Sequence, residues 1–221
     1  MSRLPIIDVY CLFWPDWLPF FGDLLHLLDP QEMAIAARYS FDNDRRRFVI
    51  CHGCLRRILG ERLKAPPRSL EILLGRDGKP FAAGNWQFNL SYGGSWAIIA
   101  IAERIPIGVD LELFRQFPEA VSIARNYFSP DEHRIIESTT EPKRSRTFLT
   151  LWTRKEAYLK ATGRGLTASL DEFSVGLEAP WIFDNAGCRW GLANLPCLAT
   201  HAAALCAPGR WRWRQRPLPQ L

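Results

Sequence analysis

The stretch Ile107-Gly-Val-Asp-Leu-Glu-Leu113 alternates apolar and acidic side chains near the middle of the chain. Successive side chains of a β-strand point to opposite faces, so Val109 lies on one face and Asp110 and Glu112 lie on the other. Residues two apart on a strand are separated by roughly 6.5–7 Å. The two carboxylates can therefore converge on one cation, although a half-exposed strand with a solvated acidic face explains the pattern equally well.

A second charged segment, Trp152-Thr-Arg-Lys-Glu-Ala-Tyr-Leu-Lys160, lies about forty residues downstream. At about 100° per residue, a helix brings four of its side chains into one arc: Trp152, Lys155, Glu156 and Lys160. An exposed pair of Glu156 and Lys160, which stabilises a helix by about 0.2–0.5 kcal/mol, explains two of them. That pair explains less well why Leu159 shares the arc, because charges in an apolar stripe are buried and need partners.

Together the two segments offer three carboxylates and two lysines. Carboxylates without His or Cys suit a hard cation such as Mg²⁺, which keeps several waters and also binds substrate phosphates. Neighbouring lysines would neutralise phosphate charge. The set therefore indicates group transfer at a pyrophosphate, with positioning and electrostatics as the main sources of catalysis. A Walker loop and a Ser, His and Asp set in a hydrolase context are both missing from the sequence, which argues against those two enzyme classes.

Outward from these segments, apolar periodicity and turn residues predict strands mixed with a few helices. Phe128-Ser-Pro-Asp-Glu132 has the spacing of a helix start with a capping box. Strands are expected at residues 5–13, 69–74, 86–90, 95–102 and 107–114, a turn at 76–80, and helices at 30–63, from 130, and at 145–162. This order favours an α+β fold with antiparallel pairing. The best boundary lies near residues 103–106 and separates an N-terminal half, 1–105, from a C-terminal half, 106–221.

The composition is that of a soluble globular protein, with 221 residues of which 48% are hydrophobic and 23% are charged. No apolar run approaches the roughly 18 residues that cross a bilayer, and Asp8 interrupts the first apolar stretch, so neither a membrane span nor a signal peptide is expected. Six cysteines do not suggest a disulfide scaffold and fit a reducing cytoplasm. Cys51-His-Gly-Cys54 resembles half a zinc site, but no second close pair completes it, which favours cysteines buried in a helix.

The net charge of +5 would allow a nucleic-acid partner. Four of these charges lie in Arg210-Trp-Arg-Trp-Arg-Gln-Arg216, and subtracting them from +5 leaves +1. The alternation of Arg and Trp is strand periodicity, so an edge strand or a tail is favoured over a nucleic-acid-binding arm. The remaining basic residues could hold a small polyanion.

The two charged segments resemble the signature motifs of the 4′-phosphopantetheinyl transferase superfamily, and their spacing also matches. Shorter similarities are Gly78-Lys-Pro80, Phe88-Asn-Leu-Ser91, Phe128-Ser-Pro-Asp-Glu132 and Gly163-Arg-Gly-Leu166. Length and motif order resemble the surfactin-synthetase-activating class, which implies a monomer of two similar α+β halves packed side by side with a pseudo-twofold relation. The likeness covers residues 38–175. It implies transfer of the phosphopantetheine arm of coenzyme A to a serine of an apo acyl or peptidyl carrier protein, with release of 3′,5′-ADP.

The resemblance also implies what individual residues do. Asp110, Glu112 and Glu156 would hold Mg²⁺, or Mn²⁺ in its place. Glu156 would also accept the proton of the carrier serine, and Lys160 would stabilise or protonate the departing oxygen. The residues implied to contact coenzyme A are Arg47, Lys79, Ser91, Tyr92 and Lys155. For Arg47 and Lys79, a solvated surface charge is the alternative.

One position departs from the family pattern. The Phe-Asn-Leu-Ser motif usually continues with His, which contacts the 3′-phosphate of coenzyme A, whereas this chain has Tyr92. Tyrosine can donate one neutral hydrogen bond and carries no positive charge near neutral pH. The expected metal site is intact, and a weaker dependence on the 3′-phosphate is predicted.

Two other functions fit parts of the sequence. A non-catalytic module of the same fold that binds a carrier or coenzyme A would be favoured by the loss of a carboxylate, yet all three are present. An RNA-binding protein would use the nine Trp and the Arg-rich segment, but it leaves the carboxylates unexplained. Carriers of fatty acid, polyketide, nonribosomal peptide and aminoadipate pathways all fit equally well as acceptors.

Overall fold

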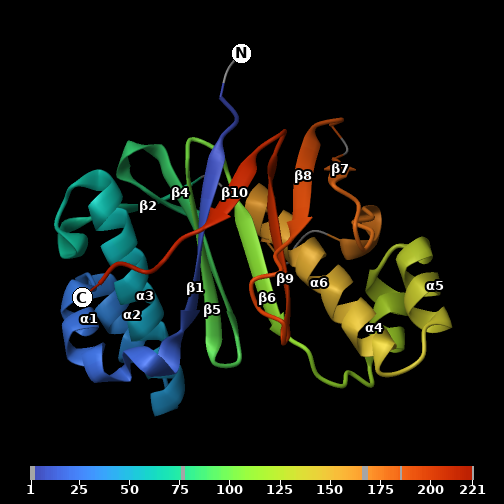
Figure 1. Ribbon diagram of the computed structural model, residues 1–221, viewed down its shortest axis with the longest axis horizontal. Coiled ribbons are helices and arrows are strands. Elements are labelled where there is room, and N and C mark those ends of the chain that lie inside the picture. The colour runs from blue at the N-terminus through green and yellow to red at the C-terminus, as the bar shows by residue number, and fades with distance from the viewer. Residues whose placement is uncertain (1–2, 76–77, 166–168, 185, 221) are drawn as a thin grey trace.

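Two β-sheets lie against each other at the centre of the molecule, and helices cover their outer sides (Figure 1). The computed structural model describes residues 3–75, 78–165, 169–184 and 186–220. The first sheet has the order β10-β1-β5-β4-β3-β2 and is made of β1 (Ile6–Phe13), β2 (Ile72–Leu74), β3 (Pro80–Ala82), β4 (Trp86–Gly93), β5 (Trp96–Glu103) and β10 (Arg212–Gln215). The second has the order β6-β9-β8-β7 and is made of β6 (Gly108–Leu113), β7 (Trp181–Phe183), β8 (Arg189–Asn194) and β9 (His201–Pro208).

The helices divide between the two sheets (Figure 1). Helices α1 (Phe21–Leu27), α2 (Pro30–Ala36) and α3 (Asp42–Leu63) lie on the outer side of the first sheet. Helix α6 (Lys143–Thr162) covers the second sheet, and α4 (Ala120–Tyr127) and α5 (Pro130–Ser138) pack against α6. Neighbouring strands run antiparallel except for β1 and β10. The predicted α+β class is therefore confirmed. Among the described residues, no helix is both long and apolar enough to span a membrane.

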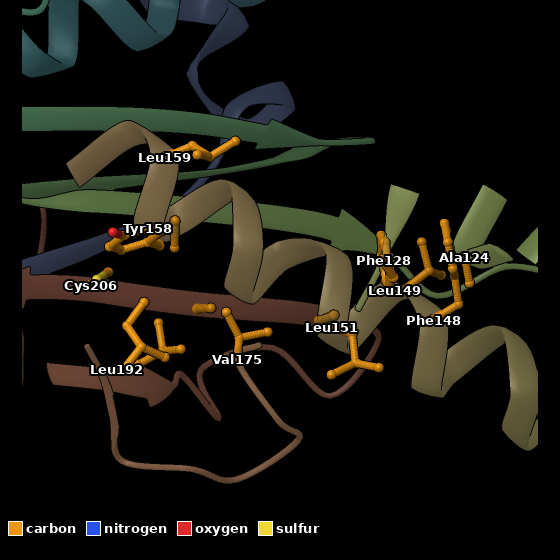
Figure 2. Close-up of a cluster of buried hydrophobic side chains, with 14 of the residues drawn as sticks. Ala124, Phe128, Phe148, Leu149, Leu151, Tyr158, Leu159, Val175, Leu192 and Cys206 are labelled. Atoms are coloured by element: carbon orange, nitrogen blue, oxygen red, sulfur yellow. The ribbon is translucent and has the colours of Figure 1, made fainter. Parts of the chain in front are cut away.

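Each sheet buries apolar side chains on both of its faces. One cluster lies between the first sheet and α3, a second surrounds α6 and the outer face of the second sheet, and a third fills the space between the sheets. Figure 2 shows the cluster around α6, where Phe128 and Phe148 lie at one end and Tyr158 and Cys206 at the other. This arrangement fixes the position of α6, which carries the second charged segment.

Helix termini on the α6 side follow the signals in the sequence. Ser129 accepts from the backbone N–H of Glu132, whose carboxylate accepts from the backbone N–H of Ser129, so the predicted capping box is present. Helix α6 ends at Gly163, which has a φ of 73°, a left-handed conformation that glycine adopts without strain.

Several predicted elements have different bounds. The helix expected over 30–63 is two helices, because residues 38–41 leave the helical conformation and Asp42 and Asp44 form a favourable acidic first turn for α3. The strand expected over 69–74 is reduced to β2, because Pro67–Ser69 forms a 3₁₀ turn. The strand expected over 86–90 continues to Gly93. Part of the turn expected at residues 76–80 lies outside the described residues, which exclude 76 and 77.

The Arg- and Trp-rich C-terminal segment forms an edge strand. Strand β10 pairs in parallel with β1, and Arg214 forms an ion pair with Asp8, which also accepts from Arg62 of α3 at 2.6 Å. The C-terminal strand thus joins the sheet that is formed by the first part of the chain. The division at residues 105 and 106 stays a prediction, and the last strand lies across it.

The backbones of strand β6 and helix α6 approach each other so closely at Gly108 that no side chain would fit between them. A Cβ atom at Gly108 would lie 2.0 Å from the backbone oxygen of Ala157 and 2.3 Å from the backbone nitrogen of Ala161. The missing side chain therefore sets the distance between the two elements that carry the charged segments.

Gly108→Ala should destabilise the chain by about 3 kcal/mol or more, because the clash is between backbone atoms that no side-chain rotation can relieve. Urea denaturation followed by circular dichroism measures the loss. The matched control is Gly22→Ala in α1, where an added Cβ meets no atom within 4 Å, and this variant should be neutral or slightly stabilised. Equal stability of the two variants would show that β6 and α6 can move apart at no cost.

Candidate active site

Asp110 of β6 is the centre of a polar cluster between the two halves. The residue is 5% exposed, and its Oδ1 accepts from the Ser91 hydroxyl at 2.8 Å and from the Lys160 ammonium at 2.6 Å. Its other oxygen, Oδ2, is buried and has no hydrogen-bond partner among the described residues. A buried carboxylate oxygen without a partner is costly, so its position calls for a ligand.

Strand β4 holds the acidic strand in place through two polar side chains. The Asn89 carbonyl accepts from the backbone N–H of Val109 at 2.8 Å, and the Ser91 hydroxyl accepts from the backbone N–H of Leu111 at 3.2 Å. Strand β6 is an edge strand, so these two N–H groups would otherwise lack a ladder partner. The contacts place Asp110 directly beside Ser91.

Helix α6 brings Glu156 and Lys160 to the same cluster. The Oε1 atom of Glu156 is buried and has no hydrogen-bond partner among the described residues. Burial raises the pKa of Glu156, the negative charge of Asp110 raises it further, and Lys160 partly opposes both effects. Within the described residues, the ion pair of Lys160 is formed with Asp110 at 2.6 Å and not with Glu156. The interpretation of Glu156 and Lys160 as a simple helix pair is therefore wrong.

Glu112 belongs to the same group of interacting charges. Burial raises its pKa, Asp110 and Glu156 raise it further, and Arg115 and Lys160 lower it. The three carboxylates thus repel one another across the gap between β6 and α6. A divalent cation would relieve this repulsion and would satisfy the two partnerless oxygens. Oxygen donors alone suit a hard cation such as Mg²⁺ or Mn²⁺.

The carboxylates are not gathered into a ready coordination sphere. No group of three or more His, Cys, Asp or Glu side chains in the described residues has the geometry of a metal site. Lys160 lies on the Asp110 oxygen that faces Ser91. A cation would therefore require the half-buried side chains of Glu112 and Glu156 to rearrange.

Two cavities border the cluster. One of about 310 Å³ is lined by Gly78, Lys79, Asn89, Glu156, Leu159, Lys160, Gly163 and Gly165. A smaller one of about 150 Å³ is lined by Glu112, Arg115, Phe117, Ile123, Phe148, Leu149 and Trp152. The first is rich in glycine and contains two lysines, so it can take an anion of extended shape. The second is mainly apolar and reaches the cluster at Glu112.

Lys79 lies at the wall of the larger cavity, where it joins the two halves. Its ammonium donates to the backbone oxygens of Ile107, just before β6, and Ala161, in the last turn of α6. Burial lowers its pKa to about 8. At pH 7 the side chain is therefore still mostly charged, and its charge lies at the negative end of the α6 dipole.

Lys155 does not reach the cluster, contrary to the expectation of a common helix arc. Its side chain is fully buried, forms an ion pair with Glu132 at 2.8 Å, and donates to the backbone oxygens of Leu170 and Phe173. Burial lowers its pKa, and Glu132 opposes that effect. The side chain of Lys155 turns to the flank of α6 that faces α5, so the phosphate contact expected for it is not supported by its position.

Arg47 and Tyr92 lie together on the other face of the first sheet. The guanidinium of Arg47 stacks over the ring of Tyr92 at 5.1 Å and pairs with Asp44 at 2.9 Å. Because side chains alternate along β4, Ser91 faces the acidic cluster while Tyr92 faces α3. Of the residues expected to bind coenzyme A, the structure brings Ser91 and Lys79 to the cluster or its cavity, and it separates Arg47 and Tyr92 from Asp110.

Two contributions were missed by reasoning from the sequence. Asn89 supports β6 and lines the larger cavity, and its signal was the polar pair at alternate positions, 89 and 91, of an otherwise apolar strand. Arg154 is buried and donates to Asn194 and to the backbone oxygens of Val175 and Ala179, so it anchors the segment after α6. The residues next to Arg154 in the sequence do not indicate these hydrogen bonds, because the partners lie far along the chain.

Two protein-family models match consecutive parts of the chain. Residues 14–104 match the N-terminal part described for 4′-phosphopantetheinyl transferases, and residues 106–206 match the 4′-phosphopantetheinyl transferase superfamily. The 4′-phosphopantetheinyl transferase HetI of Nostoc sp. is 38% identical over 70% of this chain and 67% of its own length. The chain belongs to the 4′-phosphopantetheinyl transferase superfamily.

Other relatives agree with this assignment. A putative 4′-phosphopantetheinyl transferase of Synechocystis sp. is 35% identical over 66% of this chain and 61% of its own length, and Sfp of Bacillus subtilis is 26% identical over 70% and 68%. The resemblance to the surfactin-synthetase-activating class is thereby confirmed. The chain spans about three fifths to two thirds of the length of the curated relatives it matches. A holo-(acyl-carrier-protein) synthase of Bacillus anthracis in complex with CoA (3′,5′-ADP) aligns with 47% of this chain and 96% of its own, at 16% identity and a TM-score of 0.37.

Glu156→Gln should stabilise the folded chain at pH 7 by about 1 kcal/mol, because it removes a charge that burial and Asp110 both oppose. A raised pKa means that the native state binds more protons than the unfolded state between the two pKa values. The stability of the wild type should therefore fall as pH rises through this window, and the variant should lack that loss. The two proteins converge near pH 4 and separate by pH 7.

Urea denaturation over pH 4–8 measures this difference. Glu61→Gln, at an exposed position of α3, is the matched control and should change stability by less than about 0.5 kcal/mol. A Glu156→Gln variant less stable than the wild type at pH 7 would mean that Glu156 is a stabilising partner of Lys160, as in a simple surface pair.

Proposed function

We propose that this chain is a Mg²⁺-dependent 4′-phosphopantetheinyl transferase. It would move the phosphopantetheine arm of coenzyme A to a serine of an apo acyl or peptidyl carrier protein and release 3′,5′-ADP. Membership of the superfamily supports the reaction class. The observation that carries the proposal is the pair of buried, partnerless oxygens of Asp110 and Glu156 beside a cavity lined by Lys79 and Lys160.

The donor set fits a divalent cation, which Asp110, Glu112 and Glu156 would hold. When bound, the cation supplies positive charge next to the pyrophosphate and so lowers the cost of charge build-up during transfer. The chain supplies the rest of the positive charge through Lys79 and Lys160. Both lysines line the larger cavity, which suits the diphosphate and the nucleotide end of coenzyme A.

Glu156 is suited to accept the proton of the carrier serine. Its raised pKa makes it a better base than an ordinary glutamate. The serine oxygen then bonds to the phosphorus that carries the pantetheine arm, and the bond from that phosphorus to the bridging oxygen breaks. Lys160 donates a hydrogen bond or a proton to the departing oxygen of 3′,5′-ADP.

Lys79 would contact the nucleotide end of coenzyme A from the wall of the larger cavity, and Arg47, on the other face of the first sheet, would contact the 3′-phosphate. Arg47 is partly exposed and stacks on Tyr92, so the ring orients the guanidinium, which fixes a side chain that would otherwise sample many rotamers. Tyr92 itself lies under Arg47. In this arrangement Tyr92 contributes to binding of the 3′-phosphate by orienting Arg47, and not by a hydrogen bond of its own.

The alternative is a module of the same fold that binds a carrier or coenzyme A without catalysis. All three carboxylates and Lys160 interact in the structure, which favours the enzyme. We also propose that the protein acts as a monomer in the cytoplasm. The carrier itself has to be found by experiment among fatty acid, polyketide, nonribosomal peptide and aminoadipate carriers.

Incubation with coenzyme A, Mg²⁺ and a panel of apo carrier proteins, read by intact mass, tests the proposal. At least one carrier should gain a phosphopantetheine group, chelation should abolish the gain, and Mg²⁺ or Mn²⁺ should restore it. Asp110→Asn should lower the rate by about 10²-fold or more, because it removes one charge at the cluster and keeps the shape of the side chain.

Asp23→Asn on α1 is the matched control, since Asp23 is exposed and its helix lies on the outer side of the first sheet, away from β6 and α6 (Figure 1). Its rate should equal that of the wild type. Coenzyme A and carrier binding without transfer, in the presence of Mg²⁺, would favour the non-catalytic module. Full transfer in chelator, with metal content checked by elemental analysis, would show that the reaction needs no divalent cation and would contradict that part of the proposal.

A further inference from the structure

Two cysteines lie together where the two halves of the molecule meet. Cys11 belongs to β1, and Cys197 lies in the loop between β8 and β9. Both side chains pack against the apolar cluster between the two sheets, and each thiol lies close enough to the other to affect its ionisation. The thiol of Cys197 also lies 3.9 Å from the backbone oxygen of Leu195.

The other cysteines differ from this pair. All six cysteines are described and are free thiols. Cys51, Cys54 and Cys206 are buried, and burial raises the pKa of each thiol, which makes them unreactive. Cys188 is exposed, and Cys11 and Cys197 are the two that are partly exposed. The pair therefore combines access from solvent with a neighbouring thiol.

The pair spans the same two sheets as the candidate active site. Cys11 stands opposite Ile98, and Ile98 stands opposite Ser91, so these three residues form one row across β1, β5 and β4. At about 4.8 Å per strand, Cys11 lies roughly 10 Å from Ser91 on the same face. On the other sheet, Leu195 bonds to Ala203 of β9, the register partner of Leu111. A bond between the thiols would therefore fix the separation of the sheets close to the cluster.

The two thiols affect each other's ionisation: their interaction lowers the pKa of Cys197 and, together with burial, raises the pKa of Cys11. The thiolate is the nucleophile in thiol–disulfide exchange. Whichever cysteine of the pair reacts first, the other lies beside it and can resolve the mixed disulfide.

We propose that Cys11 and Cys197 form a reversible disulfide that joins the two halves when a small-molecule disulfide such as oxidised glutathione is in excess. The thiolate of one cysteine attacks one sulfur of oxidised glutathione and expels one glutathione thiolate. The thiolate of the other cysteine then attacks the protein sulfur of the mixed disulfide and expels the second glutathione. The protein loses two electrons and two protons, and one oxidised glutathione becomes two molecules of glutathione.

The disulfide would close a loop that contains most of the chain. Closing a long loop restricts the unfolded ensemble, which stabilises the native state as long as the native geometry is kept. For a chain of this length, a rise of about 5 °C or more in Tm is expected. This inference is independent of the proposed transferase activity, since it rests on the two thiols alone.

The test treats the purified full-length chain with oxidised glutathione and then alkylates the remaining thiols. Intact mass and peptide mapping identify the products, and Tm is measured with and without reducing agent. The wild type and the control Cys188→Ser should both lose about 2 Da relative to the reduced form at the 11–197 pair. Both should show the rise in Tm, and dithiothreitol should reverse it.

Cys11→Ser and Cys197→Ser should form no such disulfide and show no rise in Tm. Each variant should instead keep a glutathione on the cysteine of the pair that remains, because the resolving thiol is missing. Folding of each variant is checked by the Tm of the reduced protein. Stable glutathione adducts on both cysteines of the wild type, a disulfide between other cysteines, or an unchanged thiol pair would each overturn the proposal.

Discussion

The structure depends on how strand β6 is held between its two neighbours. On one side, Asn89 and Ser91 of β4 accept from the backbone N–H groups of its free edge. On the other side, Gly108 lets its backbone lie directly against that of α6. The side chain of Asp110 lies between these two sets of contacts and so has little conformational freedom. Asp110 is therefore fixed at the point where the two halves and the helix meet.

The electrostatics of the cluster follow from this placement. Fixing Asp110 between Ser91 and Lys160 leaves one of its oxygens without a partner and brings its charge close to Glu112 and Glu156. Each of these two glutamates then has a raised pKa, which is a cost to the folded state. Charged residues with shifted pKa values are typical of functional sites. Here the charged residues border a cavity lined by two lysines.

Much of the fold could be predicted because its signals are local. The capping box at Ser129, the glycine end of α6 and the alternation of β6 each act within a few residues, and all three are present. The alternation of Arg and Trp predicted a strand or a tail, and the structure shows the strand. Its partner, β1, could not be predicted, because that pairing joins the two ends of the chain.

The candidate site shows the same division between local and distant contacts. The spacing of Asp110, Glu112, Glu156 and Lys160 indicated one charged cluster, and the structure brings these four residues into one interacting group. The periodicity also placed Lys155 in that group, but it could not show Glu132, a distant carboxylate that holds the ammonium inside the core. Tyr92 was expected at the site because the Phe-Asn-Leu-Ser motif resembles that of the family, and the motif gives no sign of its partner Arg47, which lies on another element.

The central claim is that Asp110, Glu112 and Glu156 hold a divalent cation beside the cavity for coenzyme A. The most direct measurement is a crystal structure of the protein with coenzyme A and Mn²⁺, with diffraction data collected above and below the manganese absorption edge. The account predicts one anomalous peak about 2.1 Å from an oxygen of Asp110 and of Glu156, with a pyrophosphate oxygen on its other side. Coenzyme A bound in this cavity with no peak at these carboxylates, or a peak held by other residues, would contradict the account.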